Sequence, residues 1–232
     1  MRIRRLQVAS DKPFFLYYAP GATHAPHQVD KYWSDQYKGE FDKGWDAYRE
    51  EIFERQKKLG VIPANAKLPA RYPDIKAWDK LTPKEQKLRA RFMEVYAGYL
   101  TYTDFEVGRL VNHRKEIGQL DNTLIVISIG DSGASKEGTL KGSIDRSIRG
   151  KQVTDEENIA CNLAKIGEIG TPDAKQGNYP LGWAQAANTP LRPVASGSDL
   201  VVAFEHLAIT NIVAEIFTVA MISRAMKRQR RQ

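Results

Sequence analysis

The stretch "LDNTLIVISIGDSGAS", residues 120–135, carries the strongest structural signal in the chain. Asp121 and Asn122 favour a turn. The residues that follow, "TLIVISI" (123–129), are almost continuously apolar and β-branched. A strand with this pattern is typically buried on both faces, as in a parallel sheet covered by helices. The polar, glycine-rich "GDSGAS" after it predicts a loop at the carboxyl end of the strand.

A second strand and a long helix are predicted upstream of this stretch. The aromatic-rich run "PFFLYYAP" (13–20) is closed by Pro-Gly and predicts a buried strand. The sequence "TPKE" (82–85) combines a capping threonine, a proline at the first helical position and the glutamate of a capping box. Apolar residues then follow at helical spacing to an expected end at Gly118, with a bend expected near Gly98. Strand, helical crossover and strand together predict an α/β fold with parallel strands.

Polar residues follow both predicted strands. In open parallel sheets, ligands bind outside the carboxyl ends of the strands. "GATHAPH" (21–27) and "GDSG" (130–133) should therefore lie at one edge of the sheet, with the side chains of His24 and Asp131 within roughly 15 Å of each other. At that position His24 could donate to an anionic substrate or act as a general acid. His27 is expected to point elsewhere and to be structural.

Asp131 is the candidate metal ligand. A carboxylate between glycines directly after a strand suits a hard cation such as Ca²⁺ or Mg²⁺, although it could equally bond the amides of its own turn. One carboxylate does not make a metal site, because Ca²⁺ takes six to eight oxygens. His113 and His206, in predicted helices, are expected to be structural. Cys161 has no neighbouring histidine or basic cluster and is expected to be inert.

The charge is concentrated at the two ends of the chain. The 232 residues carry a net charge of +7, with three arginines in residues 1–5 and five basic residues in 224–232. Without these, 27 basic residues face 28 acidic ones, so no specific nucleic-acid partner is expected. No apolar stretch is long enough to predict a transmembrane helix, and the compartment stays open.

The remaining segments are predicted with less detail. Residues 41–60 have helical spacing and end at a glycine, so they predict a helix. Residues 133–180 are rich in Gly, Ser, Lys and Asp and are expected to form long surface loops. Residues 199–232 are mostly apolar with a basic end, which predicts a helix that is buried or faces a partner.

Several motifs resemble one family. "DKPFFLYYAPGATHAPHQV", "GWDAYREEIFERQKKLGVIPANAKL", "MEVYAGYLTYTDFEVGRL", "LDNTLIVISIGDSGAS" and "NYPLGWAQAANTP" occur in the order and spacing of the large bacterial arylsulfatases, members of the alkaline-phosphatase-like superfamily. The resemblance covers residues 11–190, which we interpret as a partial sulfatase-like catalytic domain. Residues 191–232 are interpreted as a divergent tail with an apolar helix and a basic end.

The resemblance implies a site and a cofactor. Its family fold is α/β with a large mixed sheet, here partial. A formylglycine made from a C/S-x-P-x-R motif attacks the sulfur, and Ca²⁺ or Mg²⁺ holds a sulfate oxygen. His24 of "HAP" matches the histidine that contacts the sulfate or the leaving group. Asp131 matches a metal-binding aspartate, and Ser132 stands where the family has a metal-binding asparagine. Because a serine hydroxyl is a weaker ligand than an amide carbonyl, metal binding is expected to be weak or absent.

The departures from the family suggest what the isolated chain does. No C-x-P-x-R or S-x-P-x-R motif occurs in the sequence, and no early Asp-Asp pair is present. The resemblance therefore implies an arylsulfatase-like sulfuric ester hydrolase, acting on small sulfate esters or sulfated glycans, that is truncated and inactive as this fragment. Two alternatives stay open: a catalytically dead binding module, and a phosphoester or phosphonate hydrolase of the same superfamily. Self-association through the tail helix is a further hypothesis.

Overall fold

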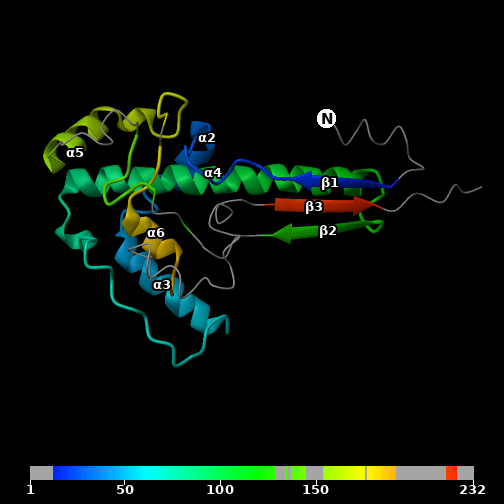
Figure 1. Cartoon of the computed structure of the whole chain (residues 1–232), viewed down its shortest axis with the longest axis horizontal. Helices are drawn as coiled ribbons and strands as arrows, with labels where there is room; N and C mark the ends of the chain where they lie inside the picture. Colours follow the sequence, from blue (N-terminus) through cyan, green and yellow to red (C-terminus); the bar gives the residue numbers. More distant parts are fainter. Residues whose placement is uncertain are drawn as a thin grey trace, which may run out of the picture.

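Three strands and five α-helices make up the described part of the protein (Figure 1). The computed structural model describes residues 13–128, 134, 137–144, 154–175, 177–191 and 218–223. The strands are β1 (Phe14–Tyr18), β2 (Thr123–Ser128) and β3 (Thr218–Ser223). The helices are α2 (Lys31–Ser34), α3 (Gly44–Lys58), α4 (Pro83–Glu116), α5 (Asp155–Ala164) and α6 (Leu181–Ala187), with 3₁₀ turns at Asp35–Tyr37, Trp78–Lys80 and Ile166–Glu168.

The strands form one sheet in the order β1-β3-β2. Tyr18 pairs with Val219 and Ser128 pairs with Thr218, and both pairings are antiparallel. Since β1 and β2 each run opposite to β3, they point in the same direction without being hydrogen-bonded to each other. The predicted parallel pairing of these two strands is therefore wrong within the described residues, because β3 lies between them and pairs antiparallel with both; only their common direction agrees with the prediction.

The predicted tail helix is wrong where it can be compared with the structure. Most of residues 199–232 lies outside the described residues, but Thr218–Ser223 form β3 instead of a helix. Its sequence, "TVAMIS", combines β-branched and apolar residues, which pack well in a strand. The long-range pairing with both other strands, which local periodicity does not reveal, decides its conformation.

Helix α4 is the longest element and begins as its sequence predicts. Thr82 and Glu85 form a capping box, in which each side chain bonds the backbone N–H of the other residue. The helix runs through Gly98 without a break, so the expected bend is not seen (Figure 1). A Cβ at Gly98 would lie 2.6 Å from the Cα of Ser34, and this glycine therefore lets α2 approach the helix closely. Beyond Glu116, Gly118 has a φ of +65° and lies in the turn to β2.

The sheet packs one face against the second half of α4. Val107, with Leu110 and Val111, contacts Leu16 of β1 and Ile125 of β2. On the opposite face of these strands, the apolar side chains of Phe15, Tyr17, Leu124 and Val126 are exposed. The expectation that β2 is buried on both faces is thus wrong within the described residues, which contain no helix over the second face.

An aromatic core joins the first half of α4 to α3 and α6. The indole rings of Trp45, Trp78 and Trp183 meet edge to face, with centroids 4.8 to 5.8 Å apart. Such edge-to-face contacts add about 0.5–1.5 kcal/mol per pair beyond area burial. The Trp183 indole also donates to the backbone oxygen of Arg89 at 2.8 Å, which ties α6 to α4.

The segment expected to form surface loops contributes to this core. Ile144, Ile169 and Tyr179 are almost fully buried. Residues 154–164 contain a second capping box, Thr154 with Glu157, and form α5. The loop prediction for 133–180 is therefore wrong in these parts, because isolated apolar residues become buried by tertiary packing that composition does not reveal. None of the described helices combines the length and the apolar character needed to cross a membrane.

Candidate functional site

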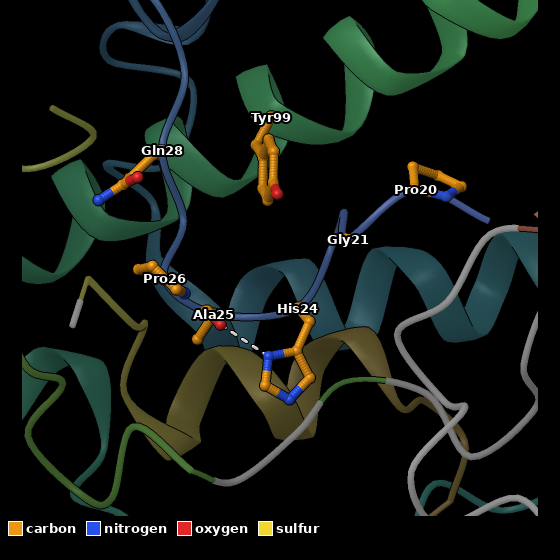
Figure 2. Close-up of a pocket in the computed structure, with 7 residues that line it drawn as sticks. All are labelled: Pro20, Gly21, His24, Ala25, Pro26, Gln28 and Tyr99. Carbon is orange, nitrogen blue, oxygen red and sulfur yellow. Dashed lines mark hydrogen bonds between the residues drawn. The ribbon is translucent and has the colours of Figure 1, made fainter. Parts of the chain in front are cut away.

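The loop between β1 and α2 lines a pocket of about 530 Å³ (Figure 2). Residues of this loop form most of the wall, and Tyr99 of α4 closes it from the side of the helix. The ring of Tyr99 points from α4 toward the loop, and the ring of His24 lies on the opposite side of that loop (Figure 2). The lining residues are Pro20, Gly21, His24, Ala25, Pro26, Gln28 and Tyr99.

The imidazole of His24 is held at one nitrogen and open at the other. Its Nδ1 lies 2.7 Å from the backbone oxygen of Ala25, so Nδ1 carries the proton that this contact needs. Its Nε2 lies 4.0 Å from a carboxylate oxygen of Glu137, and the ring is about half exposed, at 48%. A ring that carries protons on both nitrogens would donate from Nδ1 to Ala25 and from Nε2 to an incoming anion.

His27 lies away from the pocket, as predicted. Only 2% of it is exposed, and its ring stacks on Tyr179 and meets the edge of Tyr96, each with a centroid separation of 5.0 Å. Burial, with a smaller contribution from nearby His24, lowers the pKa of His27 to about 3. Its backbone N–H donates to the oxygen of Gly177 at 2.8 Å. His27 is thus a neutral anchor that fixes the loop carrying His24.

Sequence reasoning missed three residues at this site. Glu137, Gln28 and Tyr99 lie beside His24 or line the same pocket. Glu137 follows Asp131 by six positions in the polar stretch after β2, and that stretch was the only signal that could have pointed to it. Tyr99 gave no signal, because an aromatic residue within a long amphipathic helix is usually a core residue.

The predicted metal ligands Asp131 and Ser132 lie outside the described residues. The predicted distance between His24 and Asp131 stays a prediction for the same reason. Within the described ranges, no three His, Cys, Asp or Glu side chains come close enough to hold a metal ion. Glu137 supplies one carboxylate near His24, whereas a hard cation needs six or more oxygens. This part of the site does not fit a metal by itself, and no step is assigned to one.

Comparison with known proteins identifies the family. A family model described as Sulfatase matches residues 2–191. The chain belongs to the sulfatase family. An uncharacterized sulfatase of Schizosaccharomyces pombe is 35% identical over 181 residues, which are 77% of this chain and 31% of the relative. An arylsulfatase of Klebsiella aerogenes is 36% identical over 126 residues, which are 54% of this chain and 26% of the relative.

Membership in the sulfatase family has two consequences for this structure. It assigns the alkaline-phosphatase-like α/β fold, of which the mixed helices and strands described above are a part. The chain spans about a third or less of the length of these curated relatives, so much of a whole sulfatase has no counterpart in it. The pocket at His24 lies inside the matched residues.

Proposed function

We propose that this chain carries the leaving-group side of a sulfuric ester hydrolase site, with His24 as the residue that contacts the ester. The supporting observation is the state of its ring. Nδ1 is fixed by the oxygen of Ala25, while Nε2 lies 4.0 Å from a carboxylate oxygen of Glu137 and the half-exposed ring belongs to a residue that lines the pocket. Family membership supplies the class of substrate, a sulfate ester.

The chemistry follows from that geometry. A protonated His24 donates from Nε2 either to a sulfate oxygen or to the ester oxygen that leaves as an alcohol or phenol. The contact between Nδ1 and Ala25 keeps the ring oriented. After donating its proton, the ring is the neutral Nδ1–H tautomer, which the Ala25 contact already accommodates.

Turnover needs a nucleophile that the chain does not supply. The sequence contains no C-x-P-x-R or S-x-P-x-R motif, and Cys161 lies exposed on α5. Loss of a covalent nucleophile costs several orders of magnitude in rate. The isolated chain should therefore bind a sulfate ester without hydrolysing it at an enzymatic rate.

The test is binding of phenyl sulfate, followed through the ring proton signals of the four histidines. We expect the His24 signal to move in a saturable way, and His24→Gln to weaken binding about tenfold or more, as for loss of a hydrogen bond to a charged group. His113→Gln is the matched control, because His113 lies on α4 beside Glu116 and outside the pocket lining.

Three outcomes would count against the proposal. Equal binding by both variants would show that the ester does not use His24. Tighter binding of phenyl phosphate than of phenyl sulfate would favour a phosphoester site. Hydrolysis of an aryl sulfate near ordinary enzyme rates, abolished by His24→Ala, would show that the chain is not inactive alone.

A further inference from the structure

His24 of the pocket lies beside a carboxylate that comes from a distant part of the chain. Its Nε2 is 4.0 Å from a carboxylate oxygen of Glu137, and the two side chains are 48% and 55% exposed. The described residues that line the pocket include no lysine and no arginine. When the ring of His24 is protonated, a cationic donor and an anionic acceptor therefore lie side by side where a small ligand can reach both.

The loop that carries His24 is anchored to a buried segment, residues 177–181. The backbone N–H of His27, three residues after His24, donates to the oxygen of Gly177 at 2.8 Å. The ring of His27 stacks on that of Tyr179, which is itself only 1% exposed. The position of His24 is thus tied to this segment through its neighbour.

The chain that follows Glu137 lies against the same segment. A Cβ at Gly138 would clash with the backbone oxygen of Tyr179, so this close approach requires a glycine. The N–H of Leu181 donates to the oxygen of Thr139 at 2.7 Å, although Thr139 has a φ of +60°, which β-branched residues rarely adopt. Tertiary contacts hold this backbone in place against its own preference. The approach of Glu137 to His24 is therefore set by the fold before any ligand binds.

The carboxylate decides which anions suit this position. Like charges about 4 Å apart repel each other, and partial burial reduces the screening by water. A simple sulfate ester that accepts a hydrogen bond from Nε2 of His24 brings its negative charge close to Glu137. An ester that also carries an ammonium group offsets this repulsion, because the ammonium donates to the carboxylate. The pair of side chains consequently matches a ligand with both charges.

We propose that the pocket prefers a zwitterionic sulfate ester, with its sulfate at Nε2 of His24 and an ammonium group at Glu137. The inference rests on the proposed function for the sulfate end, and it adds Glu137 as the residue that selects among sulfate esters. Each hydrogen bond is about 2.8 Å long and the two side-chain atoms are 4.0 Å apart, so the bound oxygen and nitrogen lie at most about 10 Å apart. An ester of a short amino alcohol meets this limit.

Two esters of equal size test the preference. 2-Aminoethyl sulfate carries an ammonium group where propyl sulfate carries a methyl group. We would follow the ring proton signals of His24 in the full chain near neutral pH, with a chelator present so that no divalent cation supplies the positive charge. We expect 2-aminoethyl sulfate to bind about three- to tenfold more tightly than propyl sulfate, as for one partly exposed charged hydrogen bond. Added salt should reduce this ratio.

Two variants locate the preference. Glu137→Gln keeps the size of the side chain without its charge, so it should weaken the binding of 2-aminoethyl sulfate and strengthen that of propyl sulfate. A loss of folding could not produce these opposite changes. Glu116→Gln is the matched control, because the Glu116 carboxylate also lies beside a histidine, 3.8 Å from Nδ1 of His113, but outside the pocket lining. The control should keep the preference unchanged.

The outcomes separate this inference from the proposed function. Equal binding of the two esters, or a preference that Glu137→Gln retains, would overturn the inference. If His24→Gln still weakens the binding of both esters in that case, the proposed function stands without it. 2-Aminoethanol, which lacks the sulfate, identifies the opposite case. If neither ester binds but 2-aminoethanol moves the His24 signal in a manner that Glu137→Gln abolishes, both the sulfate site and the zwitterionic ester are rejected in favour of a site for cations.

Discussion

The ring of His27 stacks on the ring of Tyr179, with their planes 24° from parallel and their centroids 5.0 Å apart. Neither ring nitrogen of His27 has a hydrogen-bond partner among the described residues. A buried imidazole in this environment is stable only while it is neutral, which makes His27 a source of acid sensitivity.

The first prediction concerns pH. The pKa of His27 is about 3 in the folded protein and 6.5 in the unfolded chain, so the unfolded chain binds more protons between these values. The free energy of unfolding should therefore fall as the pH drops below 6.5, by about 2 kcal/mol between about pH 7 and pH 5. Urea denaturation across this range measures it. His27→Phe should remove this part of the pH dependence, whereas an unchanged slope, or the same change in His113→Phe, would contradict the assignment.

The second prediction compares two glycines of α4. Gly98→Ala should destabilise the protein by about 1–3 kcal/mol, because the new Cβ would meet the backbone of Ser34. Gly108→Ala should instead stabilise it by about 0.5–1 kcal/mol, since nothing lies within 4 Å of its Cβ position and alanine favours the helix. Thermal unfolding distinguishes the two. Similar effects of both changes would mean that α2 does not depend on Gly98.

The third prediction compares two capping boxes. Glu85 caps α4 and also accepts a hydrogen bond from Arg89 at 3.2 Å in a buried pair. Glu85→Ala should cost about 3 kcal/mol, because it removes both the cap and the carboxylate that the buried Arg89 guanidinium contacts. Glu157→Ala removes the same motif from α5, where Glu157 is exposed, and should cost clearly less. Equal losses in denaturation experiments would show that the Arg89 pair adds nothing beyond capping.

The fourth prediction concerns metal ions. Asp131 and Ser132 are at most two of the ligand positions that the resemblance implies, so calorimetry should detect only weak Ca²⁺ binding by the isolated chain. Ser132→Asn should strengthen it only if Asp131 already faces the ion. A dissociation constant in the micromolar range or tighter would show that further carboxylates complete the site.

Helices and strands whose caps or apolar runs lie within a short stretch of their own sequence were predictable. The "TPKE" of α4 contains its own cap, and the two aromatic or β-branched runs contain β1 and β2. Strand β3 was not predictable, because its partners lie about 90 and 200 positions earlier in the chain. Its apolar run fits either a helix or a strand until those partners are known.

The candidate site was predictable in part for a similar reason. His24 is marked by its position after a strand and by its prolines, and the structure places it at a pocket. Glu137 and Tyr99 reach the same place through the packing of separate elements, which the sequence does not specify locally. The burial of His27, in contrast, follows from the tyrosines that surround it and explains why only one histidine of the pair faces the pocket.

Helix α4 contributes residues to two hydrophobic clusters of very different size. The aromatic core contains most of the buried hydrophobic residues, whereas the sheet cluster is centred on Val107. The sheet cluster and the aromatic core should therefore unfold locally and independently of each other. Backbone amides of β1 and the last turns of α4 should exchange with solvent through a local opening, at lower free energy than amides near Val95 in the aromatic core. The protein can in this way lose its sheet while its tryptophan core remains folded, so that a chain with intact tryptophan fluorescence can still present the unpaired edges of three separated strands.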